Sequence, residues 1–183
     1  MNLADKDILN IFSKDDEGAL KALFAKYYRA LSVFAMKYLD DMQVAEDIVQ
    51  EIIIRFWEDK KYQTIQGSLK NYLFISVRNR SLNYLESFHH SKKKYLDDLD
   101  EVFSFEQFND DELQEKKEKL HQEIEKLPQQ MQVVLKMIVF EKKKYREVSE
   151  ELDISLNTVK THFSRSLKKL RGSIDILTLI FLT

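Results

Sequence analysis

The residues of this chain whose types and spacing best suit a chemical task lie near its C-terminal end. From Ile154 to Arg171 there are five Lys or Arg residues and no acidic residue. Three of these basic residues share one predicted helix face with hydroxyl and amide side chains. The residues of this face are Asn157, Thr158, Lys160, Thr161, Ser164, Arg165 and Lys168. Lys and Arg bind phosphates and guanine edges, while hydroxyl and amide groups reach phosphates and bases. The pattern predicts a helix that enters the major groove of DNA.

The surrounding sequence predicts two helices joined by a tight turn. Val148 and Leu152 are i, i+4 neighbours on the first helix. The second helix has one apolar stripe, formed by Leu156, Val159, Phe163, Leu167 and Leu170. Ser155 lies between the two and is a good N-cap, because its hydroxyl accepts a hydrogen bond from a free backbone N–H. An amphipathic surface helix whose basic end suits its dipole is the alternative, but the turn, the cap and the lack of acids favour DNA binding.

Composition favours an all-helical protein. The chain has 183 residues, enough for one medium domain or two small ones, with only 3 Gly and 1 Pro. That scarcity disfavours sandwiches, barrels and Gly-rich phosphate loops. The absence of Cys excludes disulfides and suits a reducing compartment. The first residues lack the layout of a signal peptide, and no apolar run approaches the roughly 20 residues that span a bilayer. We therefore expect a cytoplasmic protein without direct membrane insertion.

Charge is distributed in alternating blocks. Asp40–Asp59 is acidic, Ser68–Lys94 is basic, Tyr95–Glu115 contains nine acids and no base, and Ile154–Arg171 is basic. Such alternation indicates two kinds of partner surface, or two basic modules held apart by an acidic connector. We interpret residues 95–111 as a flexible acidic linker, which could also occupy a channel built for nucleic acid.

The N-terminal half predicts several amphipathic helices. Two are expected between Asp7 and Leu39, and a third begins near Val44. The third helix has a broad apolar face and an opposite face that is polar and mostly acidic, comprising Glu46, Asp47, Gln50, Glu51 and Arg55. A solvated face is the ordinary explanation of isolated charges, but this face is contiguous and acidic. A basic protein partner is therefore a hypothesis to retain.

A further helix, predicted after Ser68, interleaves bases, amides and aromatic rings. Its polar and aromatic candidates are Lys70, Asn71, Tyr72, Arg78, Asn79, Arg80 and Asn83. Rings stack on unpaired bases, amides read base edges, and basic groups follow the phosphates of a single strand. In the alternative, the rings belong to the core and the bases only solubilise the helix. The sequence leaves both interpretations open.

Other chemistry has little support. The chain has four His, and adjacent His89 and His90 point apart on a helix with no acidic or Cys cluster nearby, so we predict no metal site. We predict no catalytic residue and no cofactor, and a helical enzyme is disfavoured. The predicted architecture is all-α, with two small helical domains joined by the linker. The N-terminal domain spans 1–94, a four-helix helix-turn-helix domain spans 112–175, and an apolar tail spans 176–183.

Taken together, the two modules resemble a known family. The matching stretches are VAEDIVQEIIIRFWED, SLKNYLFISVRNRSLNYL and LPQQMQVVLKMIVFEKKKYREVSEELDISLNTVKTHFSRSLKKLR. In this order and spacing they are similar to bacterial RNA polymerase sigma factors of the extracytoplasmic-function (ECF) type, in the sigma-70 family. The resemblance covers roughly residues 19–171. A helix-turn-helix alone would be a weak signal, whereas two modules in the family's order are a strong one.

The resemblance implies a transcription initiation factor that is not itself an enzyme. Its polymerase contacts, on the clamp helices of the beta-prime subunit, would be Asp47, Gln50, Glu51 and Arg55. Residues 62–67 and the helix after Ser68 would open and read the minus-ten promoter element. The predicted recognition helix, with His162 added to its contacts, would read the minus-thirty-five element. The family often has Gly at the position of Asp153, and Asp tolerates the unusual backbone angles of such a turn.

Two further expectations follow. ECF-type factors are commonly held inactive by an anti-sigma factor, so we expect such a partner, and the apolar tail could contact it or pack on the last helix. The rival function is a stand-alone helix-turn-helix regulator, like the output domain of a response regulator, that acts without replacing the sigma subunit of the polymerase. It would require a receiver or ligand pocket in the first half, and the sequence predicts no strands there.

Overall fold

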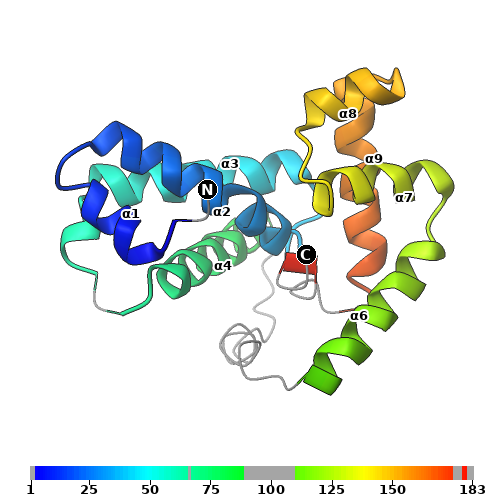
Figure 1. The fold of residues 1–183 in the computed structure, drawn as a ribbon, viewed down its shortest axis with the longest axis horizontal. Helices are drawn as coiled ribbons and strands as arrows, with labels where there is room; N and C mark the ends of the chain where they lie inside the picture. The colour runs from blue at the N-terminus through cyan, green and yellow to red at the C-terminus, as the bar shows by residue number, and fades with distance from the viewer. Residues whose placement is uncertain (1–2, 66, 89–109, 175–178, 181–183) are drawn as a thin grey trace. The chain divides into compact units, whose positions relative to one another are not determined.

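The computed structural model describes residues 3–65, 67–88, 110–174 and 179–180, and the regular structure within them is helical (Figure 1). The elements are α1 (Asp5–Ile11), α2 (Asp16–Ala35), α3 (Met42–Glu58), the 3-10 helix η1 (Lys61–Gln63), α4 (Leu69–Phe88), α6 (Asp110–Glu125), α7 (Gln129–Val139), α8 (Tyr145–Leu152) and α9 (Leu156–Leu170). The all-α prediction is confirmed for these residues.

The chain divides into two compact units. One comprises residues 1–39 and 43–103 and contains α1 to α4, and the other comprises residues 40–42 and 104–183 and contains α6 to α9. α6 begins at Asp110, two residues before the predicted start of the C-terminal domain at residue 112, because acidic residues suit the first turn of a helix. The rest of the linker, the His89–His90 pair and most of the apolar tail lie outside the described residues.

The N-terminal unit is built around aromatic and aliphatic side chains from all four of its α-helices. Phe34 of α2, Phe56 of α3 and Phe74 of α4 are among its largest fully buried side chains. The rings of Phe34 and Phe74 lie 4.9 Å apart between centroids, in a tilted contact that adds to the burial of their surface. Helical periodicity predicts the buried positions of α2 and α3, whereas the sequence leaves open whether the rings of α4, Phe74 included, belong to the core.

The short helix α1 is fastened to α2 by a polar cluster. The carboxylate of Asp5 accepts hydrogen bonds from Lys26 Nζ at 2.6 Å and from the hydroxyl of Tyr27 at 2.5 Å. Burial alone would raise the pKa of Asp5, but the hydrogen bonds from Lys26 and Tyr27 outweigh it, so the pKa is lowered. The carboxylate therefore stays ionised and holds α1 at neutral pH, and this contribution is lost as the pH falls through the lowered pKa.

The C-terminal unit packs α7, α8 and α9 around a shared core. Its buried apolar residues include Val134, Leu135 and Ile138 of α7, Val148 of α8, and Val159, Phe163, Leu167 and Leu170 of α9. A side-chain amide connects α6 to this core. Gln132 Nε2 donates hydrogen bonds to the carbonyl oxygens of Glu125 at 2.8 Å and Leu127 at 2.9 Å, and so satisfies free acceptors at the end of α6.

The turn between α8 and α9 is defined by three residues. Asp153 has a left-handed backbone, with φ 51° and ψ 45°. Ser149 makes two hydrogen bonds with Ile154, the residue after Asp153. Its carbonyl oxygen accepts from Ile154 N at 3.1 Å, and its hydroxyl donates to Ile154 O at 2.6 Å. Ser155 caps α9 as predicted, since its hydroxyl accepts from Thr158 N at 3.0 Å. Aspartate thus supplies the turn geometry for which the family often has glycine.

The left-handed angle at Asp153 gives a prediction for stability. Asp153→Val should lower the free energy of unfolding of the C-terminal unit by about 1–2 kcal/mol, because a β-branched side chain clashes in this conformation. Asp153→Gly should change it by less than about 0.5 kcal/mol, since relief of strain and the greater freedom of the unfolded chain offset each other. Amide hydrogen exchange of α8 and α9 measures both changes, with α3 as the internal reference. Equal protection in the Val and Gly variants would contradict the prediction.

Candidate nucleic-acid and polymerase contact surfaces

The packing of α9 determines which of its side chains are available to DNA. Val159, Phe163, Ser166, Leu167 and Leu170 are its buried residues. Of the predicted contacts, the structure leaves Asn157, Arg165 and Lys168 exposed and Thr158, Lys160, Thr161 and Ser164 half-buried. These residues lie on the side opposite the buried stripe, as the 3.6-residue period requires. The structure therefore brings these predicted minus-thirty-five residues onto one helix face.

Two residues of α9 depart from their predicted places. Leu156 was expected in the buried stripe, but it is 46% exposed, and that expectation was wrong. It is the first residue of α9, and side chains on a helix lean toward its N-terminus, so Leu156 projects past the packed part of the helix. His162 is half-buried, and its Nδ1 is enclosed without a hydrogen-bond partner. The His162 ring therefore offers less of its surface to DNA than Arg165 does.

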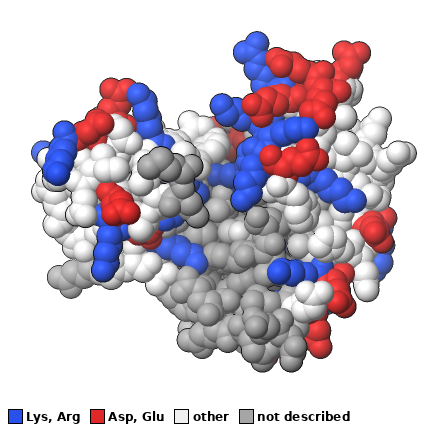
Figure 2. Space-filling model, viewed as in Figure 1, with Lys and Arg blue, Asp and Glu red and all other residues white. Residues whose placement is uncertain are grey.

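Charges next to α9 are arranged on α8. Arg146 pairs with Glu150 at 3.0 Å, and Lys143 pairs with Glu151 at 2.6 Å. Figure 2 shows red and blue side chains intermingled over α8, which carries its label in Figure 1. The charges of these pairs balance one another. On α9, Lys168 pairs with Asp40 at 2.9 Å, and Arg165 is exposed on the polar face.

The exposed face of α3 contains most of the predicted polymerase contacts. Asp47, Gln50 and Arg55 are exposed and Glu51 is half-buried, whereas Glu46 is only 3% exposed and belongs to the interior. The same face includes a large apolar residue that periodicity did not single out as a contact, Ile54, which is 38% exposed. An apolar side chain surrounded by acids and amides is typical of the centre of a protein interface.

The side chains on this face are positioned by neighbours. Gln43 Nε2 donates to Asp47 Oδ1 at 3.0 Å, and Gln50 Nε2 donates to the hydroxyl oxygen of Tyr28 on α2 at 3.2 Å. Burial raises the pKa of Tyr28, with the nearby carboxylates of Glu46 and Asp47 acting in the same direction. The tyrosine hydroxyl therefore stays neutral and remains available to the Gln50 amide at physiological pH.

Glu51 connects the predicted polymerase face to the predicted DNA-reading helix. Its carboxylate pairs with Arg55 Nη2 at 2.7 Å on the same helix and with Arg80 Nη2 at 3.0 Å on α4. Arg80 Nε also donates to Glu51 Oε2 at 3.0 Å, so the guanidinium makes two contacts with this carboxylate. Glu51, a predicted polymerase contact, and Arg80, a predicted minus-ten contact, are thus direct partners.

The remaining candidates on α4 differ in accessibility. Asn79 and Asn83 are exposed, and Lys70, Asn71 and Tyr72 are half-buried. The ring of Tyr72 lies 5.5 Å from that of Phe56, so it contributes to the core as well as to the surface. Arg78 is only 6% exposed, and its Nη1 donates to Asn79 Oδ1 at 3.2 Å. The side chain of Arg78 therefore has little surface to offer a nucleic acid in this conformation.

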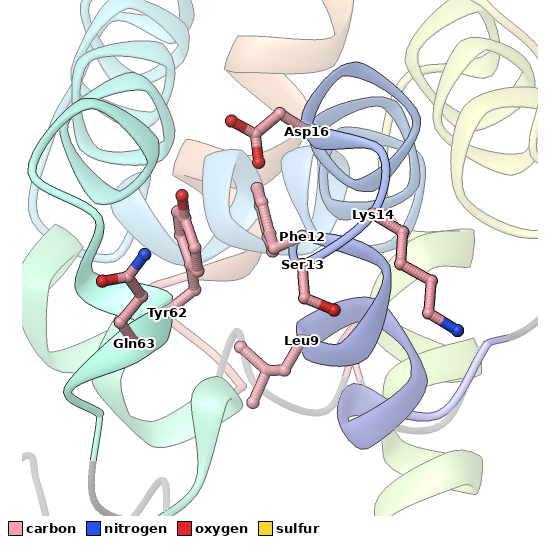
Figure 3. A pocket seen from close by; sticks show the side chains of 7 residues that line it. All are labelled: Leu9, Phe12, Ser13, Lys14, Asp16, Tyr62 and Gln63. Carbon is pink, nitrogen blue, oxygen red and sulfur yellow. The ribbon is translucent and has the colours of Figure 1, made fainter.

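A hollow of about 630 Å³ lies where α1 meets η1 (Figure 3). Tyr62 and Gln63 of η1 line one side, and Leu9, Phe12, Ser13, Lys14 and Asp16 line the other. The rings of Phe12 and Tyr62 are stacked, with centroids 4.3 Å apart. No sequence pattern indicated this hollow, because its two sides are about fifty residues apart in the chain. Tyr62 and Gln63, which line it, are the first two residues of 62–67, the segment predicted to read the minus-ten element.

Two other features are absent from the part of the chain that the structure describes. The described residues contain no group of three His, Cys, Asp or Glu residues placed to hold a metal ion. They also contain no helix with the length and apolar character needed to cross a membrane.

The fold and surfaces define a protein with two helical modules, one of which carries a DNA-binding helix-turn-helix. Family models agree with this division. The model for sigma-70 region 2 matches residues 23–88, which reach from α2 to α4, and the model for sigma-70 region 4 matches residues 117–170, which reach from α6 to α9. The chain is also 23% identical over 162 residues to the ECF RNA polymerase sigma factor RpoE of Cereibacter sphaeroides, covering 85% of this chain and 86% of that relative.

The chain belongs to the sigma-70 family, as an RNA polymerase sigma factor of the extracytoplasmic-function type. The resemblance noted in the sequence is thereby confirmed. As a member of this family, the protein is a transcription initiation factor that binds core RNA polymerase and promoter DNA.

The contact between α3 and α4 gives a second prediction. Glu51→Gln and Arg80→Gln should each weaken the packing of α4 on α3, and the double variant should lose less than the sum of the two. A coupling free energy of about 0.2–1 kcal/mol is expected for a pair this exposed. Urea unfolding followed by the fluorescence of Trp57, on α3, measures it, because Trp57 is the single Trp of the chain. Purely additive losses would show that the two side chains do not interact in solution.

Proposed function

We propose that this factor directs core RNA polymerase to specific promoters by reading two elements, the minus-thirty-five element with α9 and the melted minus-ten element with the N-terminal unit. The observation that carries the proposal is the exposed polar face of α9, which comes after a matching region-2 module in the family's order. The polymerase performs the chemistry of RNA synthesis, and the factor supplies binding surfaces.

For the minus-thirty-five element, α9 enters the major groove with Asn157, Thr161 and Arg165 toward the base edges. An arginine contacts guanine O6 and N7 in two places, and an asparagine contacts adenine in the same manner, each worth about 1–3 kcal/mol of discrimination. Lys168 is exposed one turn further along and follows the phosphates. Phosphate contacts of this kind fix register rather than sequence.

For the minus-ten element, the N-terminal unit binds the unpaired strand. Asn79 and Asn83 on α4 present exposed amides. The hollow has the size of a small-molecule site, and the half-buried ring of Tyr62, one face of which is stacked on Phe12, lines it and gives an extruded base an aromatic neighbour. Extruding a base costs a few kcal/mol. Stacking on aromatic side chains is worth about 1–3 kcal/mol per base, so one or two such contacts offset the cost.

For the polymerase, the acidic face of α3 docks on the clamp helices of the beta-prime subunit. Asp47 and Glu51 provide charge, Gln50 provides hydrogen bonds, and Ile54 provides an apolar centre. An anti-sigma factor that holds this protein inactive would act by covering α3 or α9. Because bacterial RNA polymerase works in the cytoplasm, the proposal places the factor there.

The docking proposal is tested by reversing one charge on α3. Asp47→Lys should weaken binding to core polymerase by about tenfold, equivalent to about 1.4 kcal/mol, because it places like charges in contact with a basic partner. Asp7→Lys makes the same charge change at an exposed site on α1 and should leave the affinity unaltered. Fluorescence anisotropy with labelled full-length protein measures both variants. If Asp47→Lys binds core polymerase as tightly as Asp7→Lys does, α3 is not the docking face.

The promoter-reading proposal is tested on α9. Arg165→Ala should lose about 1–3 kcal/mol of discrimination at one base pair of the minus-thirty-five element, while other positions keep their effect. Arg146→Ala on α8 removes the same charge from a side chain that pairs with Glu150, and should keep full discrimination. Run-off transcription by reconstituted holoenzyme on single-base promoter variants provides the measurement. Wild-type behaviour of Arg165→Ala on every variant would rule out base reading by this residue.

A further inference from the structure

The first residue of α9, Leu156, has an apolar side chain that the fold leaves exposed to solvent. Leu156 and Ile54 are the two large apolar residues that are exposed among the described residues. Ile54 lies on the proposed polymerase face, whereas Leu156 begins the helix that is proposed to read DNA. A single exposed leucine is ordinary on a protein surface. Its place at the leading end of a recognition helix is what requires an explanation.

Helix capping does not explain why an exposed leucine occupies the first position of α9. Ser155 supplies the N-cap hydroxyl. In the usual hydrophobic staple, the residue before the cap packs on the fourth helical residue, and these positions are held by Ile154 and Val159. Leu156 occupies the first helical position, which neither arrangement uses.

The polar groups beside Leu156 are largely engaged with one another. The hydroxyls of Ser155 and Thr158 lie 2.8 Å apart in a mutual hydrogen bond, and Thr158 N–H donates to Ser155. Lys160 Nζ lies 5.7 Å from the centroid of the Tyr145 ring, over its face, and is drawn toward α8. The first turn of α9 therefore presents the methyl groups of Leu156 and the exposed amide of Asn157.

We propose that Leu156 is a specificity-determining residue that contacts the C5-methyl group of a thymine in the minus-thirty-five element, beside an adenine that Asn157 reads. The inference rests on the proposed function, because it requires α9 to be the recognition helix. Helix-turn-helix proteins direct the N-terminal residues of that helix at base edges. In the major groove only thymine presents a methyl group, and apolar side chains are its usual partners. Removing one methyl-sized apolar contact should weaken binding about fourfold.

The test replaces single thymines by deoxyuridine, which removes the methyl group and keeps every hydrogen-bonding atom. Holoenzyme reconstituted from the full chain is titrated with promoter duplexes that run-off transcription from a genomic library has identified. Wild-type holoenzyme should bind about fourfold more weakly at one uracil-substituted position of the minus-thirty-five element. Leu156→Ala should bind the thymine duplex about fourfold more weakly than wild type does, and should be indifferent to uracil at that position.

Two matched variants assign the effect to Leu156. Arg146→Ala removes an exposed side chain of α8 that belongs to no proposed binding surface, and it should keep full sensitivity to uracil. Asn157→Ala should also keep the sensitivity to uracil, but should become indifferent to 7-deaza-adenine at the neighbouring position. The proposal is overturned if no thymine of the element is sensitive in wild type, or if the sensitivity persists in Leu156→Ala. Failure of the proposed function would differ, because holoenzyme would then fail to distinguish the intact element from a scrambled one.

Discussion

The C-terminal unit depends on one constraint, that α9 must bury Val159, Phe163 and Leu167 against α7 and α8. A helix has a fixed period, so burying one stripe decides which residues lie opposite it. The rotation of α9 about its axis, and therefore the identity of the residues offered to DNA, is determined by apolar packing rather than by the polar residues themselves. The interior is densely packed, and the α8–α9 turn is held by Ser149 and Asp153. The direction of α9 is thus fixed before any DNA is bound.

The same reasoning explains the N-terminal unit, with a difference. α3 and α4 bury their apolar sides but also place polar groups at the edge of the core, such as Glu46 and Arg78. Buried charges require partners, and half-buried ones gain more from each other than exposed ones do. The pairing of Glu51 with Arg80 follows from this, because each side chain lies at the seam between the two helices. The proposed polymerase surface on α3 and the proposed nucleic-acid surface on α4 are therefore joined directly through this seam.

Much of this arrangement is predictable from the sequence, and the exceptions have physical causes. The helices, the cap at Ser155 and the exposed face of α9 follow from periodicity and local hydrogen bonding, which depend on neighbours in the chain. Leu156 was misplaced because periodicity gives an angle around the helix but not the depth of burial along it. Arg78 and Glu46 share helix faces with exposed residues, and only the approach of other helices decides their burial. The hollow lined by Phe12 and Tyr62 depends on tertiary contact between residues far apart in sequence, which no local pattern predicts.

Charge explains why such a protein works through a larger enzyme. The chain has a net charge of −2, so its overall field does not attract DNA. The basic side of α9 has few phosphate contacts to offer, and non-specific affinity rises with the number of phosphates neutralised. Base contacts from one short helix discriminate between sequences without holding the duplex strongly. A partner that itself binds DNA compensates for this weak binding, because the affinities of two linked binding events combine. In the proposed function, the acidic face of α3 binds the enzyme that holds DNA, and the polar face of α9 selects the promoter.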